Sequence, residues 1–218
     1  MEGNSNTSIM KSIKQYPINH CAVLIIAAGE SKRMGSPKQL LVVEGQTLIN
    51  RIIHIVKRAV SFPVYVVLGA SAETIQAQLP NLEINILNNT HWQEGMASSI
   101  RVGLSNAKAQ NPNLEGVLIV VCDQPYITES TINTLLQLQK EKDTPMAAAF
   151  YGDKMGTPAL FHQSIFNEIL SLKGDMGAKR IIQSRPEEVA KLHFEKGLLD
   201  IDTKEDYQAL LKEINNND

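Results

Sequence analysis

Glycines and cations follow the first strongly apolar run of the sequence. Residues 23–27 lead into a loop that contains Gly29, Lys32, Arg33, Gly35 and Lys38. Glycine permits backbone angles that expose N–H groups, and such concavities bind anions. Arg33 offers a planar fork and Lys38 a point charge, and both groups suit phosphate oxygens. The loop therefore predicts a triphosphate-binding site, with a solvated basic turn as the alternative.

Two familiar phosphate-binding patterns do not fit this loop. Five residues separate Gly29 from Gly35, and Ser36 and Pro37 follow, whereas the P-loop requires G-x-x-x-x-G-K-[ST]. The dinucleotide fingerprint G-x-G-x-x-G is absent from the loop as well. Neither pattern therefore accounts for this loop.

Acidic residues supply a second kind of chemistry. Asp123 follows the six apolar residues 117–122, and an isolated buried charge is so costly that it must be capped, paired or bound to a cation. Magnesium prefers oxygen ligands and commonly combines one or two carboxylates with substrate phosphates. Asp123 is therefore a candidate magnesium ligand, with a turn or N-cap role before Pro125 as the alternative.

A late acidic pair could complete such a metal site. Asp200 and Asp202 are two positions apart, so on an extended segment both side chains point the same way. Either could supply the second metal ligand, or one could cap a helix that begins at Thr203.

Alternating strands and helices must bring these groups together. Apolar, β-branched runs predict strands at residues 23–27, 63–69, 84–87, 117–122, 146–151, 157–161 and 189–194. Helical spacing predicts helices at residues 46–60, 71–79, 96–107, 128–141, 164–172, 178–183 and from 203. This order indicates a mainly parallel sheet covered on both faces. Ligands bind such sheets at the carboxyl ends of the strands, where the basic loop and Asp123 fall.

The composition limits the partners and the cellular compartment that we expect. A net charge of −2 over 218 residues gives no general basic field, so no nucleic-acid partner is expected. No apolar run approaches the roughly 20 residues of a membrane span, so no membrane partner is expected either. Cys21 and Cys122 lie in or beside apolar runs, which indicates free thiols in a reducing compartment, the cytoplasm. Residues 1–20 lack an apolar signal core and are expected to form a flexible tail before one domain, residues 21–218.

Six segments in register carry a resemblance to a known family. They read AAGESKRMGSPKQLL, NNTHWQEGMASSIRVGL, VVCDQP, GTPALF, LKGDMGAKRII and DIDTKED. In this order they resemble the MobA-like nucleotidyltransferases, and within them the molybdenum cofactor cytidylyltransferases. The resemblance implies a three-layer α/β/α, Rossmann-like and GT-A-like fold with a mainly parallel mixed sheet. It implies transfer of CMP from CTP to the terminal phosphate of molybdopterin or molybdenum cofactor, with Mg²⁺ or Mn²⁺ as the metal and a molybdoenzyme as the partner that receives the product.

The resemblance also assigns roles to single positions. The nucleotide-binding set is Ala27, Ala28, Gly29, Arg33, Lys38, Gly95, Ser98, Ser99 and Asp123, of which Gly95, Ser98 and Ser99 match a base-facing segment. The catalytic residues are Arg33, Lys38 and Asp123, and the metal ligands are Asp123 and Asp202. Asp200 is the competitor of Asp202 for the second metal position. The acceptor-binding set is Gly156, Thr157, Pro158, Gly174, Asp175 and Gly177. Lys179 departs from an arginine frequent in the family, which leaves that acceptor contact open.

Two other functions remain compatible with these motifs. The same chemistry could serve another phosphorylated acceptor, such as a sugar or polyol phosphate, because the basic loop and Asp123 do not distinguish acceptors. A non-catalytic protein that binds the cofactor for loading into a molybdoenzyme is the third hypothesis. Intact Arg33, Lys38, Asp123 and Asp202 argue against that hypothesis, since a carrier needs no complete metal and triphosphate set.

Overall fold

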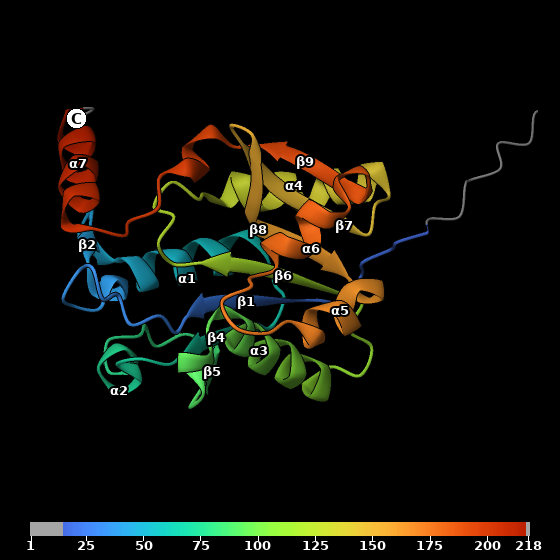
Figure 1. The fold of residues 1–218 in the computed structure, drawn as a ribbon, viewed down its shortest axis with the longest axis horizontal. Coiled ribbons are helices and arrows are strands. Elements are labelled where there is room, and N and C mark those ends of the chain that lie inside the picture. The colour runs from blue at the N-terminus through green and yellow to red at the C-terminus, as the bar shows by residue number, and fades with distance from the viewer. Residues whose placement is uncertain (1–14, 217–218) are drawn as a thin grey trace, which may run out of the picture.

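A seven-stranded sheet forms the centre of the computed structural model, which describes residues 15–216 (Figure 1). The strands are β1 (Cys21–Ala27), β4 (Val64–Leu68), β5 (Asn85–Asn88), β6 (Gly116–Val121), β7 (Met146–Tyr151), β8 (Lys154–His162) and β9 (Val189–His193). Their order across the sheet is β5-β4-β1-β6-β8-β7-β9. Only β8 runs against the other strands, because β6 and β7 both pair with it in antiparallel fashion. The predicted mainly parallel mixed sheet is confirmed.

The two central strands are buried on both faces, which explains their unbroken apolar sequences. Every residue of β1 is buried, and its side chains alternate between two hydrophobic cores. Leu24 and Ile26 belong to one core, and Val23 and Ile25 belong to the other. The run that ends at Cys122 occupies β6, the middle strand of the seven.

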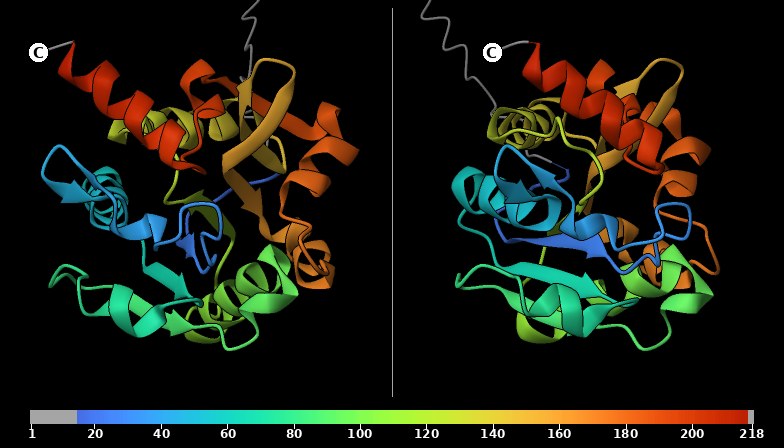
Figure 2. Two further views of the ribbon diagram at one scale, coloured as in Figure 1. Left: turned by 60° about the vertical axis from the view of Figure 1, so that its left-hand side comes forward. Right: turned by 90° about the vertical axis from the view of Figure 1, so that its left-hand side faces the viewer.

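Helices cover both faces and give three layers (Figure 2). On one face lie α1 (Leu48–Ala59), α2 (Ala72–Gln76) and α4 (Glu129–Lys142). The other face carries α3 (Met96–Gln110), α5 (Phe166–Ser171) and α6 (Lys179–Ser184). Both described cysteines are buried and free, as predicted.

A short hairpin was not predicted. Strands β2 (Val42–Val43) and β3 (Gln46–Thr47) pair around a turn at Glu44 and Gly45, both of which have positive φ. Helix α1 consequently begins at Leu48 rather than at residue 46, and the Thr47 side chain accepts the hydrogen bond of its N-cap.

The last helix, α7 (Lys204–Asn215), joins this hairpin rather than the sheet. Thr203 and Asp206 form the predicted capping box at its start. Ile201 and Leu210 pack with Val43 in a small separate core, and α7 stands at the hairpin's side of the molecule in Figure 1. The segment before α7 is therefore fixed both by the packing of Ile201 with Val43 and by the capping box at Thr203.

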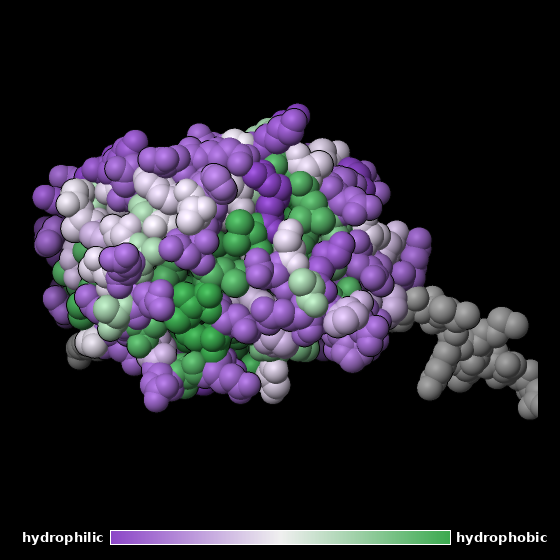
Figure 3. Space-filling view, turned by 90° about the horizontal axis from the view of Figure 1, so that it is seen from below, coloured by the Kyte–Doolittle hydropathy of each residue, from purple (hydrophilic) through white to green (hydrophobic). Residues whose placement is uncertain are grey.

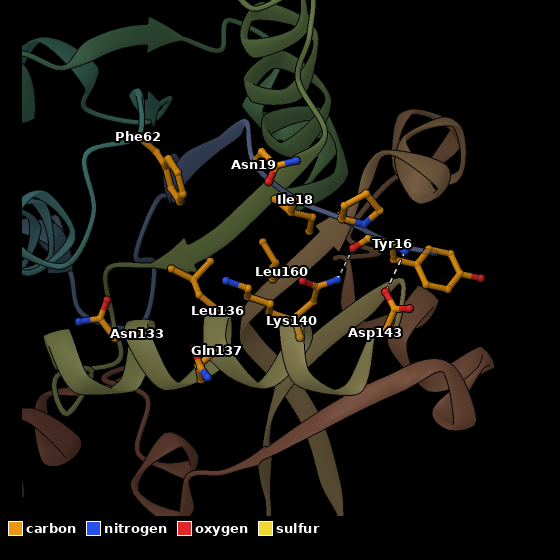
Figure 4. A pocket seen from close by; sticks show the side chains of 12 residues that line it. Tyr16, Ile18, Asn19, Phe62, Asn133, Leu136, Gln137, Lys140, Asp143 and Leu160 are labelled. Carbon is orange, nitrogen blue, oxygen red and sulfur yellow. Dashed lines mark hydrogen bonds between the residues drawn. The ribbon is translucent and has the colours of Figure 1, made fainter. Parts of the chain in front are cut away.

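The predicted tail lies outside the described residues as far as residue 14, whereas residues 15–20 contact the domain. The backbone N–H of Tyr16 donates to Asp143 at 2.9 Å, and the N–H of Asn19 donates to Glu115 at 2.6 Å. Ile18 packs against the core in a cavity of about 460 Å³ whose lining includes Leu136 of α4 (Figure 4). These six residues therefore pack beside the C-terminal end of α4 and the residue before β6.

Strand β5 is an edge of the sheet. Seen from that side, apolar side chains gather on the surface (Figure 3). Ile86 of β5 is 38% exposed and Leu82 just before it is 37% exposed. Among the described residues, no helix is both long and apolar enough to cross a membrane.

Candidate active site

The site lies at the carboxyl ends of β1 and β6. The basic loop leaves β1 at Ala28, and Asp123 follows β6 after one residue. The segment before α7 joins them because the N–H of Ile201 donates to the carbonyl of Asp123 at 3.0 Å. Three segments that are far apart in sequence thus meet at one edge, as predicted for an open α/β sheet.

Gln39 shapes the basic loop, a role that sequence reasoning missed. Its side chain is 1% exposed, and its amide donates to the carbonyls of Ala27 at 3.0 Å and Gly29 at 2.9 Å. The N–H of Lys38 donates to Ser31 Oγ at 3.1 Å, and Met34 is buried beneath the loop. Among the described residues, no partner accepts a hydrogen bond from the backbone N–H groups of residues 30–33. These donors are available to an anion.

A Gln39→Leu variant tests this role. We expect it to lose about 2 kcal/mol of unfolding free energy, because two carbonyls lose their buried donor. The measurement is urea denaturation followed by circular dichroism. Gln137→Leu is the matched control, since the Gln137 amide bonds Glu141 on the exposed surface of α4 and its loss should cost only a few tenths of a kcal/mol. Equal stability losses in the two variants would contradict the assigned role.

Four charged side chains form a cluster beside the loop. Lys38 Nζ lies 2.6 Å from Asp123 Oδ2 and 2.8 Å from Asp202 Oδ1. Arg33 Nη2 lies 2.7 Å from Asp202 Oδ2. The Lys38 side chain is only 14% exposed, whereas Arg33 is 67% exposed. The structure therefore brings together all the predicted catalytic and metal residues.

The cluster shifts the acidities of its members. Partial desolvation acts against the pKa shift of Asp202, but Lys38 and Arg33 outweigh it and lower this pKa. Desolvation would lower the pKa of Lys38, yet the two carboxylates raise it. Desolvation and the charge of Asp123 raise the pKa of Asp200 to about 6. Lys38 and Asp202 are therefore a firmly ionised pair, whereas Asp200, which interacts with both of them, is a weaker acid than Asp202.

The helix caps exclude the N-cap alternatives, whereas Asp123 does lie in a turn after β6, as the other alternative predicted. Thr128 caps α4 and Thr203 caps α7, so neither Asp123 nor the late aspartates cap a helix. The Asp206 carboxylate accepts from the N–H of Asp202 at 3.1 Å and thereby orients that residue. Of the late aspartates, it is Asp202 that shares a cation with Asp123.

The acidic residues fit a divalent cation. Asp123 and Asp202 direct one oxygen each at the same point, and oxygen pairs of this kind suit magnesium when phosphates and water complete its shell. Asp123 Oδ1 is buried without a hydrogen-bond partner among the described residues. Within those residues, no group of three His, Cys, Asp or Glu side chains converges on one position, so substrate oxygens would have to supply further ligands.

A cavity of about 460 Å³ opens on the other side of the basic loop. Its lining includes the predicted nucleotide residues Ala28, Gly29, Gly95 and Ser99, together with Trp92. This is room for a planar base between walls that combine apolar side chains, such as Trp92, with polar ones, such as Ser99.

Ser98 does not line that cavity. Its hydroxyl donates within its own turn and accepts a hydrogen bond from the amide of buried Asn89 at 2.8 Å. Asn89 also donates to Ser99 Oγ at 2.9 Å. Asn89 therefore fixes the start of α3, and nothing in the sequence pattern indicated this buried amide.

The predicted acceptor residues have different neighbours in the structure. Asp175 lines the base-side cavity, and the carbonyl of Gly174 accepts from the N–H of Ala97 at 3.1 Å. Gly177 packs against Met96 of α3. Gly156, Thr157 and Pro158 instead lie in β8, with a cis peptide bond between Thr157 and Pro158. Gly156 lies beside Tyr151.

The mixed sheet with its convergent loops is a Rossmann-like nucleotidyltransferase fold. The chain belongs to the MobA-like NTP transferase domain family, whose model matches residues 23–189. It is similar to nicotine blue oxidoreductase of Paenarthrobacter nicotinovorans, with 30% identity over 171 residues, 75% of this chain and 81% of the relative. Purine catabolism protein PucB of Bacillus subtilis is 28% identical over 200 residues, 86% of this chain and 94% of PucB.

Solved structures agree with this assignment. Rv0371c from Mycobacterium tuberculosis superposes with a TM-score of 0.76 at 26% identity, over 90% of this chain and 100% of the other. The same mycobacterial protein in complex with manganese gives a TM-score of 0.74 at 24% identity, over 88% of this chain and 98% of the other.

Proposed function

We propose that this protein transfers CMP from CTP to the terminal phosphate of molybdopterin or molybdenum cofactor and releases pyrophosphate. The observation that carries the proposal is the meeting of the basic loop with Asp123 and Asp202 beside a base-sized cavity. The sequence Ala27-Ala28-Gly29-Glu30 favours cytidine, since the guanylyl branch that the chain resembles typically opens with Leu-Ala-Gly-Gly. The partner that would receive the product is a molybdoenzyme.

The reaction needs positioning more than proton transfer. A phosphate oxygen of the acceptor attacks the α-phosphorus of CTP, and the bond to the β-phosphate breaks so that pyrophosphate leaves. The attacking oxygen is already anionic at neutral pH, so no general base is required. Arg33 and Lys38 would offset the repulsion between the two polyanions and the charge on the leaving group.

A bound Mg²⁺ or Mn²⁺ would neutralise phosphate charge, held by Asp123 and Asp202. The convergence of Asp123 Oδ2 and Asp202 Oδ1 on one point supports a cation between these carboxylates. Manganese is a reasonable substitute because the mycobacterial relative is described in complex with it.

Pyrophosphate release tests the proposal. Purified protein is given molybdopterin, magnesium and CTP, GTP, ATP or UTP in turn, and we expect release with CTP at least about tenfold faster than with the others. Release with a sugar or polyol phosphate but not with molybdopterin would favour the alternative acceptor. Absence of release with every combination would favour a cofactor-binding protein without transferase activity.

A further inference from the structure

We infer that Lys38 keeps the metal position closed until a nucleotide draws its ammonium away, so that the divalent ion and the triphosphate bind together. The inference rests on the proposed function only in assuming a divalent ion at Asp123 and Asp202. It concerns the regulation of that site in the nucleotide-free protein.

The carboxylate oxygens at the metal position are all occupied or closed. Asp123 Oδ2 and Asp202 Oδ1 bind the Lys38 ammonium at 2.6 and 2.8 Å. Asp202 Oδ2 binds Arg33 at 2.7 Å. The remaining oxygen, Asp123 Oδ1, is closed to solvent. A hydrated ion therefore finds no free carboxylate oxygen in this arrangement.

The ammonium and the ion would compete for one place. Magnesium lies about 2.1 Å from its oxygen ligands, so an ion shared by Asp123 and Asp202 would fall in the space that Lys38 Nζ now fills. Two cations at this separation also repel each other strongly. Lys38 and Arg33 balance the charges of Asp123 and Asp202, so this pair attracts a free ion less strongly than two unpaired aspartates would, although Asp200 adds a further carboxyl nearby.

The Lys38 head group can move while its backbone stays. The N–H of Lys38 donates to Ser31 Oγ, and its carbonyl accepts from the N–H of Leu41 at 3.1 Å. Only the flexible four-carbon stem has to swing to carry the charge toward a phosphate. The basic loop places that phosphate next to the lysine, so one movement opens the metal position and supplies a phosphate contact.

Manganese binding without nucleotide tests the inference. Mn²⁺ is titrated into wild-type protein and a Lys38→Met variant, and free Mn²⁺ is measured by electron paramagnetic resonance. If the lysine vacates its position less than a tenth of the time, removing it should tighten Mn²⁺ binding at least about tenfold. The melting temperature of Lys38→Met should also rise more with Mn²⁺ than that of wild type.

Three further variants sharpen the comparison. Lys142→Met removes a charge of the same kind from an exposed position in the last turn of α4, so its Mn²⁺ affinity should match wild type. Adding Asp123→Asn to Lys38→Met should remove the gain. Lys38→Gln keeps a hydrogen-bond donor and serves if Lys38→Met does not fold.

Equal or weaker Mn²⁺ binding by the folded Lys38 variant would overturn the inference, as would an equal gain in Lys142→Met. The assay contains neither nucleotide nor acceptor, so it is independent of the test of CMP transfer. A protein that transfers CMP without the Lys38→Met gain would retain the function and lose the inference. If Lys38→Met binds Mn²⁺ more tightly but the wild-type protein does not transfer CMP, the inference stands and the proposed function is wrong.

Discussion

Replacing Asp123 by alanine is expected to lower magnesium-dependent pyrophosphate release by at least about 10³-fold while the protein stays folded. Asp123 shares the Lys38 cation with Asp202 and is the proposed metal ligand nearest the end of β6. Its loss leaves one carboxylate for the ion and frees Lys38 from one of its two partners. The measurement is the initial rate at saturating magnesium, with circular dichroism as the check on folding.

Asp123→Asn and Glu187→Ala complete this experiment. The asparagine keeps the size of the side chain and removes its charge, so we expect nearly the same loss of rate. Glu187 is an exposed carboxylate in a short 3-10 helix, Pro186–Glu188, and its removal should leave the rate unchanged. Near-normal turnover by a folded Asp123→Ala protein would show that the metal assignment is wrong.

The parts of the site that follow buried strands could be predicted from the sequence. Strands β1 and β6 are covered on both faces, so they appear as unbroken apolar runs, and the polar residues after them stand out. Arg33, Lys38 and Asp123 were found in this way, and the family comparison agrees with the fold. The pairing of Lys38 with Asp202 could not be predicted from apolar runs. It joins positions 164 residues apart and depends on the packing of α7 on the hairpin.

The roles of the buried amides and of the turn near Asp175 could not be predicted from the sequence. Gln39 and Asn89 are polar residues whose roles depend on the carbonyls and hydroxyls around them, and those partners are set by the fold. Asp175 was grouped with the acceptor residues by resemblance, whereas the folded chain places it at the base-side cavity. A turn between helices carries no periodicity that predicts its neighbours. Its position is set by the close contact between Gly95 and Gly174.

That contact makes Gly95→Ala the second variant with a large expected effect. Gly95 has φ of 113° and ψ of −176°, a conformation in which a side chain costs about 1–3 kcal/mol. A Cβ at this position would also lie 2.5 Å from the carbonyl of Gly174 and would collide with the Asp175 carboxylate. Asp175 could rotate, but Gly174 is backbone and its carbonyl accepts from Ala97, so the whole turn must shift.

The cavity wall moves with that turn, since Gly95 and Asp175 both line it. We therefore expect Gly95→Ala to weaken CTP binding by at least about tenfold, measured by calorimetry, and to lower the melting temperature. Gly45→Ala separates the effect of backbone strain from the effect of the steric collision. Gly45 also has positive φ, but its Cβ would meet nothing within 4 Å. That control should lose about 1 kcal/mol of stability and keep its CTP affinity. Unchanged CTP binding by Gly95→Ala would mean that the base does not occupy this cavity.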